Sequence, residues 1–234
     1  MSTTPYTLML LVPAEHATLP PVGGDLCWTR VPDEDHAEVW LVHPASCTDA
    51  ELDAWHRAEL LGEDVPLVWV ERMLSDQAHV PLPGHTLLRL SLSTSLRRTV
   101  RVAPHAWALA MRVVGALHVT FAWSTSDYAL DALWAGGEPP WRQVHPTLIF
   151  HEVFLGRLHL DPFSLDDIAG DGDVFRLKRF SSHWLVQAPE GLGNESAAMP
   201  DHGAVDNALL FALQRVTGGH NDAVQHWLQG AHTP

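Results

Sequence analysis

The sequence predicts an α+β fold, in which an N-terminal mixed α/β domain precedes a small, mostly-β domain and C-terminal helices. Short runs rich in Val and Trp, at residues 38–43 and 67–71, are typical of strands. Apolar residues at helical spacing lie between these two runs. Breaks rich in Gly and Pro then divide the chain. The predicted units are a domain at 1–135, a second domain at 141–190, and a linker with a helical tail at 191–234.

The first predicted domain begins with a buried strand over residues 6–12, and a loop rich in Pro and Gly follows it. A helix is predicted after Thr48. This residue can cap a helix, and Glu51 follows three residues later as in a capping box. The apolar residues that follow recur at helical spacing, and Gly62 ends the helix.

The rest of the chain is predicted to contain both strands and helices. Residues 87–102 alternate for part of their length, as a strand or hairpin arm does. A helix over 105–114, a strand over 117–123 and a short helix over 126–134 complete the first domain. The clearest linker follows at 135–140, and the tail is predicted to hold two helices, at 204–216 and 221–229.

The composition excludes several classes of function. The chain carries 28 acidic and 14 basic residues, a formal net charge of −14. This charge argues against a nucleic acid or an anionic membrane surface as the partner. No apolar stretch approaches the roughly 20 residues that a membrane span needs, and no secretory signal pattern precedes the first apolar run. We therefore expect a cytoplasmic protein with no direct membrane insertion. Its cysteines, Cys27 and Cys47, are interpreted as ordinary thiols.

Residues 148–160 read LIFHEVFLGRLHL and would be apolar on both faces if they were extended. A half-buried strand of an antiparallel sheet would instead show polar residues on one face. Two interpretations are open at this point. The segment is either a central strand buried within its own sheet, or a strand that is exchanged with another chain.

A short helical turn and two more strands are predicted after this segment. Leu165 and Ile168 lie on one side of the helical turn. A Gly-Asp turn leads into a strand over residues 174–178, and a Ser-Ser turn leads into a strand over 183–187.

This order of residues resembles the SpoA (surface presentation of antigens) domain of type III secretion cytoplasmic-ring proteins. The matching features are a strand that ends in Leu155 and Gly156, an extended arm, a short helical turn that contains Leu, and a Gly-Asp-Val turn into a further strand. SpoA domains pair as intertwined dimers by exchanging strands. The resemblance therefore favours the second interpretation of residues 148–160.

The resemblance implies a non-enzymatic component of the injectisome cytoplasmic ring, or sorting platform, which supports protein export. The chain resembles the N-terminal product of a split form, so the implied partner is a second SpoA-domain subunit on a separate chain. Other implied partners are the ATPase stator and the ring adaptor, and the implied location is the cytoplasm, at the apparatus on the inner membrane. The residues expected to contact the partner are Phe150, Val153, Phe154, Leu155, Gly156, Leu158, Leu160, Leu165, Ile168, Val174 and Leu177.

The sequence contains no catalytic or metal-binding motif that we could identify. Its 16 histidines form no HExxH or HxH pair, and the spacing of His145 and His151 suits no common ligand geometry. The acidic residues between 166 and 173 lack the order of a calcium loop, and GxSxG and phosphate-binding loops are absent. We expect no catalytic residue, metal or cofactor. The alternative is a small soluble hydrolase, or a metal- or ligand-binding enzyme, that uses His and Asp residues.

Overall fold

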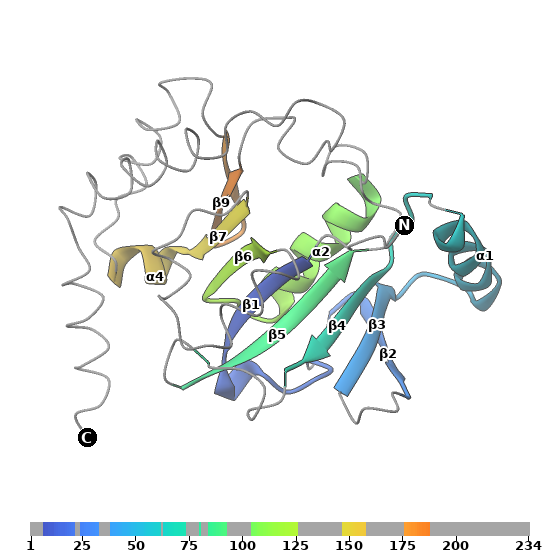
Figure 1. The fold of residues 1–234 in the computed structure, drawn as a ribbon, viewed down its shortest axis with the longest axis horizontal. Coiled ribbons are helices and arrows are strands. Elements are labelled where there is room, and N and C mark those ends of the chain that lie inside the picture. The colour runs from blue at the N-terminus through green and yellow to red at the C-terminus, as the bar shows by residue number, and fades with distance from the viewer. Residues whose placement is uncertain are drawn as a thin grey trace.

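The computed structural model describes residues 7–21, 24–32, 38–61, 63–73, 80, 84–92, 104–125, 147–157 and 176–187. These residues form a nine-stranded sheet in the order β2-β3-β4-β5-β1-β6-β7-β9-β8, and all neighbouring strands are antiparallel (Figure 1). A large antiparallel sheet with few helices agrees with the α+β class. The strands are β1 (Thr7–Pro13), β2 (Leu26–Val31), β3 (Glu38–Pro44), β4 (Val68–Arg72), β5 (His85–Leu92), β6 (Phe121–Thr125), β7 (Thr147–His151), β8 (Arg176–Phe180) and β9 (His183–Gln187).

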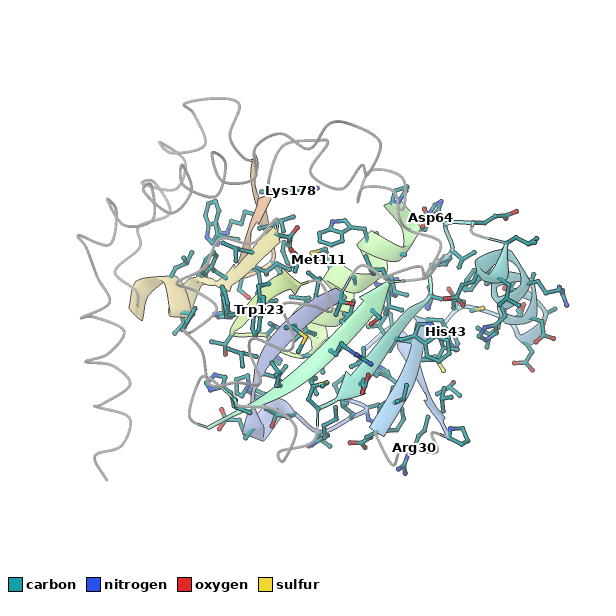
Figure 2. All side chains as sticks on the ribbon, viewed as in Figure 1. Arg30, His43, Asp64, Met111, Trp123 and Lys178 are labelled. Carbon is teal, nitrogen blue, oxygen red and sulfur yellow. The ribbon has the colours of Figure 1, made fainter. Side chains whose placement is uncertain are left out.

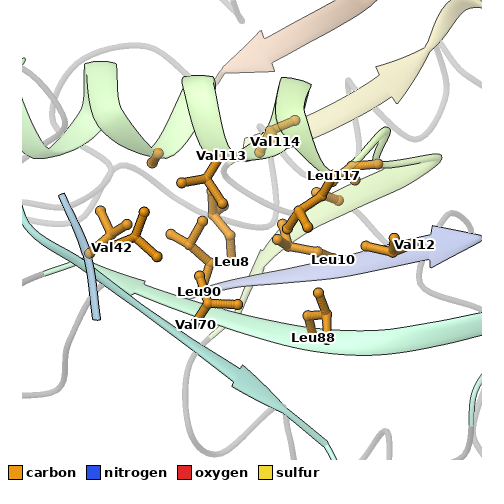
Figure 3. Packing of buried hydrophobic residues seen from close by; sticks show 14 of the residues in the cluster. Leu8, Leu10, Val12, Val42, Val70, Leu88, Leu90, Val113, Val114 and Leu117 are labelled. Atoms are coloured by element: carbon orange, nitrogen blue, oxygen red, sulfur yellow. The ribbon is translucent and has the colours of Figure 1, made fainter. Parts of the chain in front are cut away.

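The core lies between the centre of the sheet and helix α2 (Pro104–Ala116) (Figure 3). β1 pairs with β5 along one edge and with β6 along the other. Its residues are buried from Thr7 to Val12, so both of its faces are covered as well. Leu8 and Leu10 face α2, where they pack with Val113 and Val114. A central strand of this kind reads as a continuous apolar run, which confirms the strand predicted over residues 6–12.

Both ends of α2 depend on residues beyond the predicted helix. At the beginning, the Asp64 carboxylate accepts hydrogen bonds from the backbone N–H groups of His105 (2.9 Å) and Ala106 (3.1 Å). These bonds satisfy N–H groups that have no partner within the helix. At the other end, residues 117–119 close the helix. The strand predicted to start at residue 117 therefore starts only at Phe121.

Helix α1 (Asp49–Leu60) lies beside the edge of the sheet formed by β2, β3 and β4 (Figure 1). Its residues Leu52 and Trp55 pack against Leu41 and Leu67, which point away from the α2 side. The predicted capping box is present at its first turn. The Glu51 backbone N–H donates to Thr48 Oγ1 (3.3 Å), and the Thr48 N–H donates to the Glu51 carboxylate (2.9 Å).

Thr48→Ala is expected to lower the free energy of unfolding by about 1 kcal/mol, because one capping bond of an exposed helix end is lost. Thr48→Ser keeps the hydroxyl and should stay within about 0.5 kcal/mol of the original chain. Urea unfolding of the two variants measures both values. Equal destabilisation of both variants would contradict the capping role.

The first outer strand, β2, was not predicted from the sequence. It pairs with β3 alone among the strands that the structure describes. Its side chains are half-buried or exposed, and Arg30 is exposed. An outer strand of this kind has no clear alternation of buried and exposed residues, so the pattern that reveals an inner strand is missing.

The extended segment predicted over residues 148–160 is wrong at residues 152–157, and residues 158–160 lie outside the described ranges. β7 ends at His151, and α4 (Glu152–Arg157) follows directly. Both faces of β7 are buried within this chain: Ile149 joins the α2-side core, while the Phe150 ring lies 5.0 Å from the Phe121 ring. β7 is thus a central strand between β6 and β9, as the first of the two interpretations proposed.

The segment that resembles a SpoA domain belongs to the same sheet as the N-terminal strands, because β7 pairs with β6. The predicted β8–β9 hairpin is present, with a two-residue turn at Ser181 and Ser182. The predicted division into domains, the SpoA fold and the intertwined dimer stay predictions. The predicted elements at residues 126–134, 161–168, 204–216 and 221–229, and the linkers at 135–140 and 189–203, lie outside the described residues.

Candidate functional site

The predicted partner-binding residues differ sharply in exposure. Phe150, Phe154 and Leu155 are buried in the chain's own core, at 2%, 1% and 0% exposure. Val153 on α4 is 57% exposed, and Gly156 is also exposed. Among the described residues, the exposed part of the predicted partner-binding surface is therefore smaller than expected. Leu177 lies in β8, and five of the predicted residues lie outside the described ranges: Leu158, Leu160, Leu165, Ile168 and Val174.

Beside α4, the outer strand β8 concentrates positive charge. It holds three of the 14 Lys and Arg residues of a chain whose net charge is −14: Arg176, Lys178 and Arg179. The Arg179 guanidinium pairs with the Glu152 carboxylate of α4 at 3.0 Å and lies 5.7 Å from the Trp184 ring. Lys178 is exposed, and Figure 2 shows it at the opposite end of the sheet from Arg30. α4, β8 and β9 thus form a connected surface with a basic outer strand.

A cleft of about 520 Å³ lies at the neighbouring end of the sheet. Four histidines line it, from four different segments: His16, His85, His118 and His151. Its other described lining residues are Pro13, Glu15, Gly84, Thr120, Val153 and Phe154. We call this the histidine cleft. Its volume lies in the range of small-molecule sites in proteins.

The antiparallel register explains why these histidines meet. His16 follows the end of β1, and His85 begins β5 opposite Pro13 of β1. The turn that precedes β6 holds Thr120, whose carbonyl accepts a hydrogen bond from the His151 N–H (3.0 Å). Because neighbouring strands run in opposite directions, the end of one strand lies beside the start of the next. Residues that are far apart in the sequence therefore share one end of the sheet.

His118 has a backbone conformation that glycine usually provides. The helix α2 ends in a Schellman motif: the Val119 N–H donates to the Val114 carbonyl, and the His118 N–H donates to the Gly115 carbonyl, both at 3.3 Å. The residue at the position of His118 takes the left-handed conformation, and its φ is 50°. A residue with a Cβ is strained there. At this strained position the His118 imidazole lies in the cleft, and its ring centroid is 4.8 Å from that of His16.

His118→Gly is expected to raise the free energy of unfolding by about 1 kcal/mol, because glycine adopts positive φ without steric cost. His105→Gly is the matched control, since His105 lies in the helical part of α2. There the same substitution should be destabilising, by about 0.5–1 kcal/mol. Thermal or urea unfolding of both variants measures the sign. Destabilisation by His118→Gly would show that the imidazole itself stabilises the fold.

His151 and His183 form a pair at the inner side of the cleft, with ring centroids 5.0 Å apart. His183 is buried, and its Nε2–H donates to the Val119 carbonyl (2.8 Å), so the neutral ring has no proton on Nδ1. That Nδ1 has no hydrogen-bond partner among the described residues. Burial is the main cause that lowers the pKa of both histidines below the ordinary value of 6.5. Glu152 raises the pKa of His151, and the hydrogen bond to Val119 raises that of His183, while the neighbouring His118 lowers both, and burial outweighs the opposing causes.

The histidine cleft was not found from the sequence. The only available signal was that histidines lie near strand ends, at positions 16, 85, 118, 151 and 183. This signal is useful only when the strand order is known. Within the described ranges, no three His, Cys, Asp or Glu side chains are placed to share a metal ion. The described lining combines four histidines with one acidic residue, Glu15, and the alternative of an enzyme that uses His and acidic residues stays a prediction.

The comparisons with known proteins identify no family. No protein-family model matches the chain, and no curated protein matches it significantly. Among solved structures, the chain is similar to the Pseudomonas aeruginosa T6SS protein PA0821, with 13% identity and a TM-score of 0.44. The match covers 91% of this chain and 73% of that chain. This is a distant structural neighbour from a secretion system. Separately, none of the helices in the described part of the chain is long and apolar enough to cross a membrane.

Proposed function

We propose that the protein is a non-enzymatic subunit of the type III secretion cytoplasmic ring, or sorting platform, and that it binds a second SpoA-domain subunit through α4 and β8. The sequence resemblance supports the family. The observation that carries the proposal is the basic outer strand β8 of an otherwise acidic chain. The Arg179–Glu152 ion pair joins this strand to α4, the helix that carries the exposed Val153.

An outer strand can bind a partner by accepting another strand on its open side. Among the described residues, β8 pairs with β9 only. Lys and Arg on an outer strand discourage pairing with unrelated strands, and they favour a partner strand that carries acidic side chains. Binding at β8 leaves β7 in place within its own sheet, so it does not require the exchange of the segment at residues 148–160.

In this proposal the ATPase stator and the ring adaptor are the further partners. The protein acts in the cytoplasm, peripherally associated with the apparatus at the inner membrane. Support for these contacts comes from the resemblance alone.

Co-expression with the SpoA-domain subunits of the same genome tests the proposal. We expect one of them to form a stoichiometric complex with the chain in light scattering. Lys178→Glu should weaken this complex about tenfold, because it reverses a charge on the binding strand. Val153→Asp should also weaken it by placing a charge on the exposed apolar contact of α4.

Arg30→Glu is the matched control, since Arg30 is an exposed basic residue on the other outer strand, β2. It makes a similar change in net charge without altering α4 or β8. The proposal fails if no SpoA-domain subunit binds the chain. The assignment of the binding surface to α4 and β8 is wrong if Arg30→Glu weakens the complex as much as Lys178→Glu.

A further inference from the structure

The histidine cleft has features of a binding site beyond the proposed scaffold function, with which it shares the exposed Val153 of α4. Its described lining includes four imidazoles, the Thr120 hydroxyl and the Glu15 carboxylate, with no Lys or Arg. The Glu15 carboxylate lies 3.7 Å from His16 Nε2. The Thr120 Oγ1 lies 3.0 Å from His85 Nε2. Histidines that serve only as surface residues need not converge from four segments of the chain.

The protonation of His151 indicates which chemistry the cleft offers. The backbone N–H of Val153 donates to His151 Nδ1 (3.2 Å), so this nitrogen is an acceptor. The neutral ring therefore carries its proton on Nε2 and acts there as a hydrogen-bond donor. A nitrogen that carries a proton cannot bind a metal ion. While this contact is made, His151 suits a ligand with acceptor oxygens.

The strained position of His118 is a second, independent observation. The turn would accommodate glycine without strain, and a Cβ in the left-handed conformation has an energetic cost. Strain of this kind concentrates at functional sites. The side chain of His118 lies in the cleft beside His16.

We propose that the histidine cleft binds a small molecule through an acidic group, a carboxylate or a phosphate, with His151 donating from Nε2 and with His16 and His118 as further donors. The charged and titratable groups around the ligand are Glu15, His16, His85, His118, His151 and, behind them, His183 and the Glu152–Arg179 pair.

Isothermal titration calorimetry of the full chain tests this inference, with inorganic phosphate and succinate as separate probes. Binding of phosphate alone or of succinate alone identifies the acidic group, and binding of both indicates a general acid site. We expect saturable binding of at least one of the two probes at about pH 6.

His118→Gly should weaken binding at least fivefold although the variant is more stable, so the loss cannot be due to unfolding. His16→Gln tests the neighbouring ring, and His105→Gln, on the surface of α2, is the control. Absence of saturable binding of both probes at about pH 6 overturns the inference. Unchanged affinity in His118→Gly also overturns it, as does saturable Zn²⁺ binding without anion binding. All these measurements are made without a partner protein, so they are independent of the proposed scaffold function.

Discussion

Leu155→Asp is expected to lower the free energy of unfolding by at least about 4 kcal/mol, a large part of the stability of an ordinary domain. Leu155 has 0% exposure on α4, so the substitution removes a buried apolar side chain and places a carboxylate in its position. From the sequence, this residue was expected to contact a partner chain. Its burial in the chain's own core predicts instead that the variant fails to fold before any partner is present.

Val153→Asp provides the matched comparison, because it introduces the same carboxylate two residues earlier on the same helix. Val153 is 57% exposed, so its free energy of unfolding should change by no more than about 0.5 kcal/mol. Urea unfolding of the isolated chain separates the two variants. If both unfold at the same urea concentration as the original chain, Leu155 is not in the core. The predicted exchange of this segment with another chain would then regain support.

The parts of the fold that were predicted correctly depend on local patterns. Helix α1 has its capping residue and its capping glutamate within one turn of the chain, so the sequence is sufficient to place its start. β1 was recognisable because a strand covered on both faces is apolar throughout. The segment after β7 is also apolar at most positions. Periodicity of a short apolar run does not distinguish a strand from a helix, and for this reason α4 was predicted as part of a strand.

The candidate site depends on contacts between distant residues, which the sequence did not reveal. His16 and His118 are separated by about a hundred positions, and their rings meet only because β1 and β6 are neighbours in the sheet. The cap of α2 is a similar case, since Asp64 precedes that helix by about forty residues. Strand order determines all of these contacts. No motif in the sequence specified that β6 would lie between β1 and β7.

Lowering the pH from about 7.5 to about 5.5 is expected to destabilise the protein through His183. Burial lowers the pKa of this histidine in the folded chain below 6.5, while the unfolded chain keeps the ordinary value. The unfolded state therefore binds more protons at His183 below about pH 6.5, and acid favours unfolding. The contribution of His183 to the free energy of unfolding is fully present above about pH 6.5, and it decreases as the pH falls toward the folded-state pKa of this group. The contribution of this one group is at most about 1.4 kcal/mol per pH unit.

His183→Gln isolates the effect, because the glutamine amide can still donate to the Val119 carbonyl but does not titrate. Urea unfolding of both proteins across this pH range should give a steeper acid loss for the original chain, with a difference of about 1 kcal/mol at about pH 5.5. His105→Gln, far from the cluster on α2, should leave the pH dependence unchanged. Parallel curves for His183→Gln and the original chain would mean that the His183 ring accepts a proton in the folded state. The orphaned Nδ1 would then have to find an acceptor that the buried pair with His151 does not supply.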